Sequence, residues 1–431
     1  MAGTLQLDFL QPQSNTGLYI LSPTGSTMAS VNTSGIYSAT GGQMFNAAGN
    51  FVNPVISTGS SLTIQTANTT AVTIDSSQNA TFTGYVNAPN SFGFKNRIIN
   101  GGMVIDQRNA GASVTPTNAQ FIADRWSAQI SQSSKFSVQQ VTDAPAGFSY
   151  SSKVTSLSAY SVVSGDYFLY RQNIEGYNIA DLAFGTSTPS TVTVSFWTKS
   201  SLTGSFSVSI YNNDGSRTYP ALYTINSANT WEYKTVTIAG SNSGTWGTTN
   251  GIGITLTFGL GGGSTYSSTQ GTWNTSGSWT PFATGATQIV GTNGATWQVT
   301  GVQLEKGSTA TSFDYRPYGT EFLLCQRYYQ KTAGFTCVGS SATEVGASEF
   351  FCVQMRSAPS IGQTGVLTIE NMGVADITQS STSISWRSSR YNSVGGAFTL
   401  TNFSGLTQFR PYIQNVNHNG TDNYITLSAE L

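Results

Sequence analysis

The sequence has few charged residues. Only 9% of its 431 residues are Asp, Glu, Lys or Arg, against about 25% in an average soluble protein, and the formal net charge is −1. Lys and Arg form no run, so the clustered cations that bind nucleic-acid phosphates are missing. Disordered chains usually have a high net charge, and this sequence does not. The composition therefore excludes nucleic acid as a partner and favours a folded protein.

Long apolar runs and cysteine patterns are also absent. No stretch approaches the roughly 18 apolar residues of a membrane span. Residues 1–10 lack the basic and apolar regions of a signal peptide, so we expect no membrane insertion and assembly in a cytoplasm. Cys325, Cys337 and Cys352 have neither a disulfide framework nor C-x-x-C spacing. Each lies beside Phe, Leu or Val, which predicts three buried thiols.

Uncharged polar and aromatic residues fill the place of the charges. Aromatics make up 12% of the chain, and 46 residues are Gly. Ser, Thr, Asn and Gln mixed with β-branched and aromatic residues are typical of two-faced antiparallel strands joined by polar turns. The sequence therefore predicts an all-β protein, and its length predicts two to four domains.

The first predicted domain, residues 1–94, is an N-terminal attachment or fibre segment of short strands. Its only charged residues are Asp8 and Asp75. The stretches Leu62-Thr-Ile and Val72-Thr-Ile predict strands that are too short to bury a core alone. The two stretches are loosely similar to each other. Short repeats of this kind gain a core by stacking or by wrapping with identical chains. A flexible linker is the alternative.

The second predicted domain, residues 95–318, has longer alternating strands. Apolar and polar residues alternate in Val192-Thr-Val-Ser-Phe-Trp-Thr, and similar patterns begin at Phe206 and Ile252. Asn213-Asp-Gly predicts a hairpin turn between two of these strands. We expect an antiparallel β-sandwich of the jelly-roll type, with a long Gly- and Ser-rich loop over residues 261–295.

The third predicted domain, residues 319–431, begins with a short linking helix over Glu321–Tyr329, after Pro317 and Gly319. The remainder reads as a C-terminal β domain that ends on a docked strand. Its expected strands are Phe335-Thr-Cys-Val, Glu349-Phe-Phe-Cys-Val-Gln-Met, Val366-Leu-Thr-Ile, Ser383-Ile-Ser-Trp, Ala397-Phe-Thr-Leu and Tyr424-Ile-Thr-Leu.

Three motifs in the second domain resemble a recurrent module of phage and prophage tail-fibre proteins, which is similar to the jelly roll of carbohydrate-binding modules. They are Asn96-Arg-Ile-Ile-Asn-Gly-Gly-Met-Val-Ile-Asp-Gln-Arg-Asn, Ala123-Asp-Arg-Trp and Val302-Gln-Leu-Glu-Lys-Gly-Ser-Thr-Ala-Thr-Ser-Phe-Asp-Tyr-Arg-Pro. Cys325-Gln-Arg-Tyr-Tyr-Gln-Lys, Met355-Arg-Ser-Ala-Pro-Ser-Ile and Ser428-Ala-Glu-Leu resemble the β domain that usually follows. Residues 10–94 match no specific attachment domain.

The resemblance implies a virion structural protein, a fibre or tail-tip component that is commonly a homotrimer. It transfers no catalytic residues, so we expect no enzyme. The implied location is the virion, after assembly in the host cytoplasm. The N-terminal segment is then expected to bind other virion proteins, and the jelly roll a host-surface glycan.

Six carboxylates near the ends of the predicted strands are Asp106, Asp124, Glu175, Asp181, Glu305 and Asp314. Local ion pairing or hydrogen bonding is their first interpretation, because the domain has so few charges. A structural Ca²⁺, which jelly rolls of the resembled class often carry, is the second, with Asp106, Asp124, Glu305 and Asp314 as ligands. Hydrolysis, which needs two carboxylates about 5 to 9.5 Å apart, is the third.

Aromatic residues provide the candidate glycan site. Sugars stack their C–H faces on Trp and Tyr rings, and their hydroxyls bond to Asn, Gln, Ser and Thr. The candidates, on strand faces opposite the apolar residues or in Gly-rich surroundings, are Trp197, Tyr211, Trp246, Tyr266, Trp273 and Trp279. Packing against a loop or a neighbouring protomer is the alternative for each of them. Trp126 and Trp231 are assigned to the core.

Three functional hypotheses remain at this point. The first is host-surface glycan recognition and adhesion by a trimeric receptor-binding fibre, which multivalency would strengthen. The second is a purely architectural virion protein, a head fibre or spacer that binds only other virion proteins. The third is a polysaccharide depolymerase, for which the sequence offers no convincing acid pair.

Overall fold

The computed structural model describes residues 94–371, 379–381, 383–415, 417–418 and 421–431, together with seven short strands between residues 18 and 82. The chain forms two compact units, Met1–Pro89 and Asn90–Leu431. Strands dominate both units, which confirms the all-β class, and one short α-helix is present in the described residues. In that part of the chain, no helix is long and apolar enough to span a membrane.

The first unit contains two small antiparallel sheets. One has the order β1-β2-β3-β4 and the other β5-β6-β7. Their strands are β1 (Leu18–Leu21), β2 (Thr27–Asn32), β3 (Gly35–Ser38), β4 (Gln43–Asn46), β5 (Leu62–Thr66), β6 (Thr69–Ile74) and β7 (Ala80–Phe82). The two similar stretches of the sequence are β5 and β6, and they pair with each other, Leu62 opposite Ile74 and Ile64 opposite Val72. The attachment role expected for residues 1–94 stays a prediction, and much of that segment lies outside the described residues.

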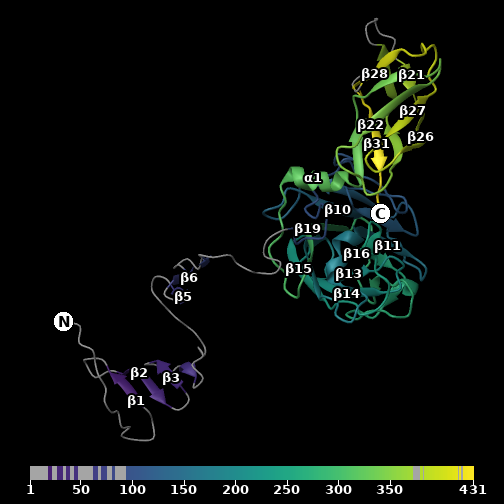
Figure 1. Cartoon of the computed structure of the whole chain (residues 1–431). Coiled ribbons are helices and arrows are strands. Elements are labelled where there is room, and N and C mark those ends of the chain that lie inside the picture. The colour runs from purple at the N-terminus through teal and green to yellow at the C-terminus, as the bar shows by residue number, and fades with distance from the viewer. Residues whose placement is uncertain are drawn as a thin grey trace. The chain divides into compact units, whose positions relative to one another are not determined.

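The second unit opens with a β-sandwich of two five-stranded antiparallel sheets (Figure 1). The first sheet has the order β15-β12-β19-β10-β9, and the second sheet β14-β13-β16-β11-β8. The strands are β8 (Ser127–Ile130), β9 (Phe136–Val141), β10 (Ser151–Ser156), β11 (Tyr167–Glu175), β12 (Val192–Ser200), β13 (Gly204–Tyr211), β14 (Thr218–Ile225), β15 (Glu232–Ile238), β16 (Ile252–Gly262) and β19 (Thr296–Lys306).

The core of the sandwich follows from the alternation in the strands. Val192, Val194 and Phe196 of β12 are fully buried, as the pattern predicts. Trp126 is also fully buried and stacks on Tyr170 with ring centroids 5.2 Å apart, which confirms its assignment to the core. The predicted hairpin joins β13 to β14, with Gly215 at φ +70°. Antiparallel sandwich and jelly-roll class are thus as expected.

The opening sequence motif forms an internal frame of hydrogen bonds. The Asn96 side chain donates to the Val302 carbonyl and accepts from the Leu304 N–H, so the opening and closing motifs meet. The Asn100 side chain donates to the Ile105 carbonyl at 2.7 Å and accepts from its N–H at 3.0 Å. Buried amides need such partners, because an unpaired one costs about 1–3 kcal/mol. The motif therefore has a structural role.

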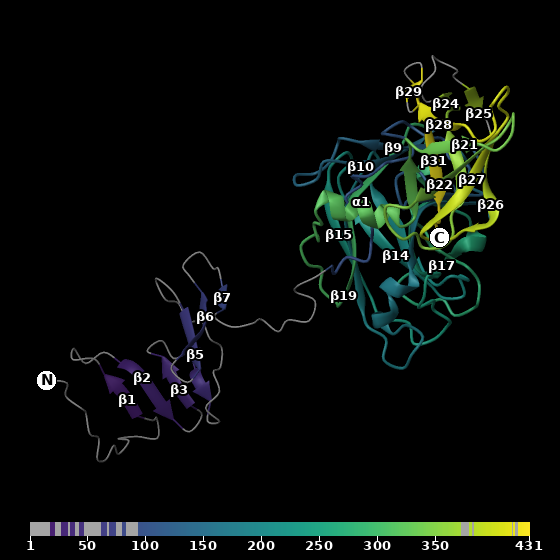
Figure 2. The same cartoon turned by 45° about the horizontal axis from the view of Figure 1, so that its top comes forward.

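The predicted linking helix is present as α1 (Tyr318–Gln326), three residues earlier than expected, because Pro317 precedes it and fixes its start. A three-stranded sheet of order β20-β31-β23 and a seven-stranded sheet of order β25-β24-β28-β21-β22-β27-β26 follow. Figure 2 shows β28, β21, β22 and β27 side by side. Their bounds are β20 (Tyr329–Thr332), β21 (Thr336–Gly339), β22 (Val345–Phe350), β23 (Ser360–Thr364), β24 (Leu367–Asn371), β25 (Gln379–Ser381), β26 (Ser383–Tyr391), β27 (Gly395–Thr401), β28 (Pro411–Asn415) and β31 (Tyr424–Ser428).

Two predictions for this part are wrong. The strand expected from Glu349 to Met355 ends at Phe350, because Phe351 and Met355 turn inward to fill the core and leave the ladder. Cys352 lies between them and is exposed, whereas Cys325 and Cys337 are buried as predicted. A neighbouring apolar residue therefore does not ensure burial where the strand has ended.

A buried ion pair joins the sandwich to the segment after α1. Glu175, at the end of β11, accepts hydrogen bonds from Arg327 Nε at 2.9 Å, Arg327 Nη2 at 2.6 Å and the Tyr328 hydroxyl at 2.5 Å. Burial acts to raise the pKa of Glu175, but these hydrogen bonds outweigh it and lower the pKa below its usual value. The carboxylate is therefore ionised and links the two parts of the unit.

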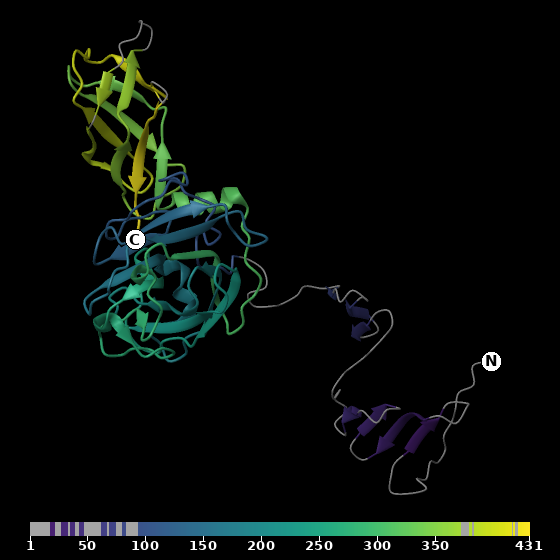
Figure 3. The same cartoon turned by 180° about the vertical axis from the view of Figure 1, so that it is seen from behind.

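A second charged cluster holds the residues after β31 at the same junction (Figures 1 and 3). The Arg125 guanidinium pairs with Glu430, and it lies 3.5 Å from the centre of the Tyr328 ring. Arg108 bridges Glu430, at 3.0 Å, and Asp124, at 3.7 Å. Burial raises the pKa of Asp124 to about 6, and the Arg108 charge offsets only part of this effect. The raised pKa of Asp124 is thus explained by its burial, which the Arg108 charge compensates only in part.

Replacing Glu175 with Gln is expected to loosen the junction. Removing one partner of a buried pair leaves the other charge uncompensated, but Arg327 remains 30% exposed, so we expect a cost of about 2 kcal/mol. The free energy of unfolding in urea measures it, with Asp181→Asn as the control. Asp181 is 48% exposed beside Arg97, so its loss should cost less than about 1 kcal/mol. Equal effects of the two substitutions would contradict the assigned role of Glu175.

Stability is expected to fall as the pH rises from about 4.5 to 6.5. The Asp124 pKa is about 6 in the folded protein and near 3.8 in the unfolded chain, so the folded protein binds more protons in this window. The other shifted carboxyl groups have lowered pKa values and lose their contribution only below this range. Thermal unfolding across the window checks this, and Asp124→Asn should flatten the slope. An unchanged slope in the variant would exclude Asp124 as the cause.

Candidate functional site

The four candidate calcium ligands are each bound by donors of the protein. Asp106 accepts the N–H groups of Asn109 and Gly111, both at 2.9 Å, and so closes its own loop. Glu305 accepts from the N–H of Thr311 at 2.9 Å and from its hydroxyl at 2.6 Å. Asp124 accepts from Gln107, and Asp314 from the Asn96 N–H. Each of these carboxylates thus has a hydrogen-bond donor of the protein as a partner.

The same carboxylates also do not converge. In the described parts of the chain, no three His, Cys, Asp or Glu side chains are arranged to hold a metal ion. Glu175 and Asp181, the other two carboxylates considered, pair with Arg327 and Arg97. The six carboxylates thus take part in local hydrogen bonds or ion pairs, which was the first interpretation from the sequence.

Trp246 and Trp273 pack together at the edge of the sandwich. Their ring centroids lie 5.6 Å apart, and both rings contact Phe184 edge to face. Trp246 is only 8% exposed, and the Trp273 indole N–H donates to the Ala239 carbonyl at 2.8 Å. These contacts bury Trp246 and hold the half-buried Trp273 against it. Through Trp273, the long loop packs back against the sandwich.

Tyr211, Tyr266 and Trp279 gather on the outer face of the second sheet. Trp279 lies 5.4 Å from the Tyr266 ring and 6.0 Å from the Tyr211 ring, and it also contacts Tyr167. A Cβ on Gly215 would lie 2.7 Å from the Trp279 ring, so only glycine leaves room for it. Tyr211 is buried under this cluster. The alternation placed Tyr211 on the correct face but could not show that Trp279 covers it.

Trp197 lies apart from the other candidates, on the outer face of the first sheet. It pairs directly with Tyr233 across β12 and β15, with ring centroids 5.4 Å apart and ring planes at 50°. Directly opposed residues of neighbouring strands have side chains on the same face. Trp197 is half-buried and Tyr233 is 42% exposed, so both rings present surface to solvent.

Three further aromatic rings stand across from this pair and complete a groove. Phe148 contacts Phe313 at 5.1 Å and Tyr315 at 5.4 Å between ring centroids. Tyr315 is 59% exposed, and its hydroxyl donates to the Gly147 carbonyl. The groove between the two sets of rings has a volume of about 660 Å³, and its lining contains no charged residue. Small polar residues of the lining include Ser195, Thr311 and Ser312.

Gly301 makes the groove possible. It lies in β19 at φ +61°, beside a register shift opposite Ser195 and Trp197. A Cβ at this position would lie 2.6 Å from Cζ of Phe148. A bulge with glycine bends a strand and lets another group approach the backbone closely. The Phe148 ring can therefore rest on the strand and form one wall.

A compensated charge pair lies beside the groove on the same face. Lys199, two residues after Trp197, bonds to Asp143, which also accepts from the Gln298 side chain at 3.1 Å. Partial burial acts to raise the pKa of Asp143, but the Lys199 bond outweighs it and the pKa is lowered. The Lys199 ammonium lies 5.1 Å from the Trp231 ring centre. Trp231 is half-buried here, so its assignment to the core is wrong.

The sequence identified one of the five groove aromatics. Tyr233 lies on an edge strand whose alternation, Glu232-Tyr-Lys-Thr-Val-Thr-Ile, could have identified it as outward-facing. Phe148, Phe313 and Tyr315 lie in two loops more than 160 positions apart. Their meeting depends on the sheet order, and no local pattern indicates it.

Trp273→Ala is expected to destabilise the protein by about 2 kcal/mol, roughly half the cost of a fully buried ring, because Trp273 is only half-buried. Trp197→Ala should cost less than about 1 kcal/mol, because Trp197 packs against the ring of Tyr233, whereas Trp273 packs against three rings. Urea unfolding of both variants measures the difference. If the order were reversed, Trp273 would be free for a ligand and Trp197 would be a structural residue.

Comparisons with known proteins give no sequence family. No family model matches the chain, and no curated protein matches it. Among solved structures, the enzymatically active domain of tailspike protein 4 of bacteriophage CBA120 is 12% identical with a TM-score of 0.27. That match covers 49% of this chain and 21% of the tailspike domain.

Carbohydrate-binding modules are also among the similar structures. A family 11 module of a cellulosomal cellulase of Clostridium thermocellum is 11% identical, with a TM-score of 0.25. The match covers 47% of this chain and 99% of the module. A xylan-binding domain of Paenibacillus barcinonensis is 12% identical, with a TM-score of 0.22 and coverage of 47% and 99%. These similarities are distant.

Proposed function

We propose that the sandwich binds a bacterial surface glycan in the groove between Trp197 and Tyr315. One observation carries this proposal: five aromatic rings from four separate parts of the chain line an uncharged hollow of about 660 Å³. That volume is within the range of about 300–1,000 Å³ that is usual for ligand pockets. Two of the rings, Tyr233 and Tyr315, are 42% and 59% exposed, so a ligand can reach them.

The chemistry of the groove fits a sugar chain better than other ligands. The C–H faces of pyranose rings stack on aromatic rings, which the groove offers on both sides. Hydroxyl groups of the sugar can bond to Thr311 and Ser312, which are exposed in the lining. An anionic ligand would find no counter-charge there, since Lys199 is already paired with Asp143. A neutral glycan is therefore the favoured ligand.

We further propose that the protein is a virion component, a phage fibre or tail tip, and that it acts without catalysis. The support is the sequence resemblance carried by the motifs that begin at Asn96, Ala123 and Val302. Several copies, most simply a homotrimer joined through residues 1–94, would raise the weak affinity of a single groove by orders of magnitude. Such a protein would attach the particle to its host by many weak contacts.

Binding to an array of bacterial polysaccharides tests the proposal, followed by calorimetry with an oligosaccharide from the polysaccharide bound. We expect Trp197→Ala and Tyr233→Ala each to raise the Kd at least tenfold, which corresponds to a loss of about 1.4 kcal/mol of binding free energy. Tyr177→Ala is the matched control, because Tyr177 is 62% exposed and lies outside the groove. Its affinity should equal that of the unchanged protein.

Three results would count against the proposal. A full-length protein that binds no polysaccharide on the array, yet is found in purified phage particles by mass spectrometry, would favour the architectural alternative. Equal losses of affinity in Trp197→Ala and Tyr177→Ala would place the binding site elsewhere. Release of reducing ends from the bound polysaccharide would show a depolymerase.

A further inference from the structure

A second hollow lies on the outer face of the seven-stranded sheet, over β21, β22 and β27. Its volume is about 680 Å³, similar to that of the groove. Val338 of β21 lies directly opposite Gly346 of β22, and Ser348 lies opposite Ala397 of β27, so these four residues share one face. Val338 is 45% exposed, which identifies this face as the outer one. We name the hollow the Arg387 cleft, after the charged residue in its lining.

The Arg387 guanidinium lies flat on the floor of the cleft, because Gly346 leaves room for it. A Cβ on Gly346 would lie 3.4 Å from both Cζ and Nη2 of Arg387 and 3.6 Å from its Nη1. Such nearly equal distances place the face of the guanidinium, rather than its edge, over the strand. The N–H groups, which lie in the guanidinium plane, are therefore directed along the floor and not into the sheet.

Arg387 is only loosely paired within the protein. Its Nη2 lies 3.5 Å from Oε1 of Glu344, and that oxygen already accepts from the Ser340 hydroxyl at 2.7 Å. In the part of the chain that the structure describes, no acceptor forms a hydrogen bond with the Arg387 guanidinium, whereas Lys199 beside the groove bonds directly to Asp143. The five N–H donors of a guanidinium match the oxygens of a carboxylate or a phosphate. Arg387 is therefore able to bind an anionic group.

Phe409 presents an aromatic ring at the side of the cleft. It is 80% exposed, and its φ of +63° is in the left-handed region that bulky residues rarely adopt. Its N–H donates to the Gly339 carbonyl at 2.8 Å, and a Cβ on Gly339 would lie 2.4 Å from the Thr407 carbonyl oxygen. The turn therefore packs directly on β21 and holds the ring in solvent. Unfavourable backbone conformations of this kind are frequent at binding sites.

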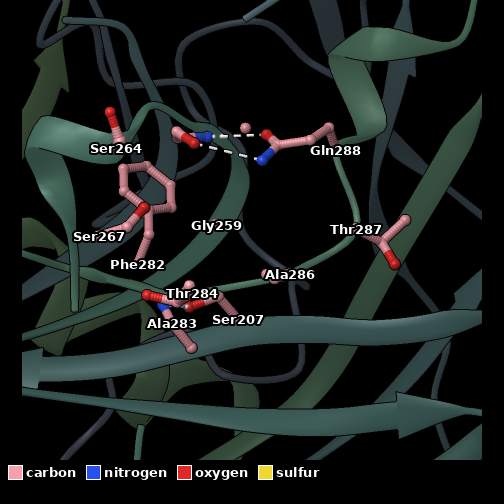
Figure 4. A pocket seen from close by; sticks show the side chains of 13 residues that line it. Ser207, Gly259, Ser264, Ser267, Phe282, Ala283, Thr284, Ala286, Thr287 and Gln288 are labelled. Atoms are coloured by element: carbon pink, nitrogen blue, oxygen red, sulfur yellow. Dashed lines mark hydrogen bonds between the residues drawn. The ribbon is translucent and has the colours of Figure 1, made fainter. Parts of the chain in front are cut away.

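The smaller pocket beside β16 lacks such accessible groups (Figure 4). Phe282 is 3% exposed there, and Ser207 is fully buried. The Gln288 side chain accepts from the Gly262 N–H at 2.8 Å and donates to the Gly262 carbonyl at 3.2 Å. The fold itself uses these aromatic and polar groups, whereas those of the Arg387 cleft are open to a ligand.

We propose that the Arg387 cleft binds a sugar residue that carries an anionic group, either a carboxylate or a phosphate. Arg387 binds the anion, and the exposed Phe409 ring stacks on the C–H face of the sugar. Thr336 and Ser348 are exposed in the lining, and their hydroxyl groups can bond to those of the sugar. The second unit then has a site for charged sugars besides the groove for neutral ones. This proposal does not require the groove to bind.

Methyl groups report on the two sites separately. Val338 and Ala397 line the Arg387 cleft, whereas Ala146 and Ala310 line the groove. The experiment is NMR of the full-length protein with labelled valine and alanine methyl groups, titrated with glucuronate, glucose 6-phosphate, glucose or acetate. At least one of the two anionic sugars should shift the Val338 and Ala397 signals at millimolar concentration, and the larger effect identifies the preferred anion. Glucose and acetate should leave both signals unchanged.

Substitutions of charged residues test the role of Arg387. Arg387→Gln should raise the Kd of the anionic sugar at least about tenfold, because a charged hydrogen bond is lost. Arg390→Gln is the matched control, since Arg390 is exposed in the same strand, β26, but outside the lining. Glu344→Gln should lower the Kd, because it removes the carboxylate that competes with the ligand for Arg387.

Phe409→Asn separates binding from stability. Asn tolerates the left-handed conformation better than Phe does, so the melting temperature should not fall. Loss of the stacking ring should raise the Kd about fivefold. Phe350→Asn is the control, because Phe350 is 85% exposed in β22 and lies outside the lining. A lower melting temperature with unchanged binding would make Phe409 a structural residue.

The proposal fails if neither anionic sugar shifts the Val338 and Ala397 signals, or if Arg387→Gln binds like the unchanged protein. An equal response to glucose would show that charge is not recognised, and an equal response to acetate would show that the cleft takes any carboxylate, including one of a protein. Either result overturns the proposal. If Arg387→Gln does not fold, the four titrations of the unchanged protein decide. A groove that binds nothing changes only the Ala146 and Ala310 signals and leaves this test intact.

Discussion

The buried guanidinium of Arg125 is the constraint on which the architecture of residues 94–431 depends. Arg125 is 1% exposed, and a buried cation without a partner is strongly unfavourable. Its partners come from two parts of the chain: the Asn173 carbonyl of β11, at 2.5 Å, and the carboxylate of Glu430 after β31. Among the described residues, the carboxylate that neutralises this charge of the sandwich comes from Glu430, after the last strand of the second β structure. This requirement fixes where the residues after β31 must lie.

Much of the fold could be predicted because its strands alternate. The pattern from Val192 onwards identified β12 and its buried face, and Asn213-Asp-Gly identified the hairpin after β13. Predictions were wrong where a chain segment leaves its pattern, as at Cys352, which lies beyond the end of β22. Alternation determines which residues share a face, but it does not determine where a strand ends.

The candidate site was harder to predict than the fold, because a site also depends on what covers a face. Trp197 and Tyr211 both lie on outer faces, as alternation indicated, but Trp279 folds over Tyr211 while Trp197 stays accessible. The covering loop is Gly-rich, and its local sequence suggested exposed tryptophans. Trp273 of this loop is instead packed against Phe184, together with Trp246 from an earlier Gly-rich stretch. Burial of this type arises from tertiary contacts that no local pattern encodes.

The scarcity of charge connects the fold with the proposed function. Four ionised side chains of the second unit compensate one another in pairs at the junction, Glu175 with Arg327 and Arg125 with Glu430. The lining of the groove contains no charged residue. Recognition at such sites must come from stacking and hydrogen bonding, which salt screens far less than it screens exposed charges. A surface of this composition would adhere to neutral glycans with similar strength over a wide range of ionic strength, which suits attachment outside a cell.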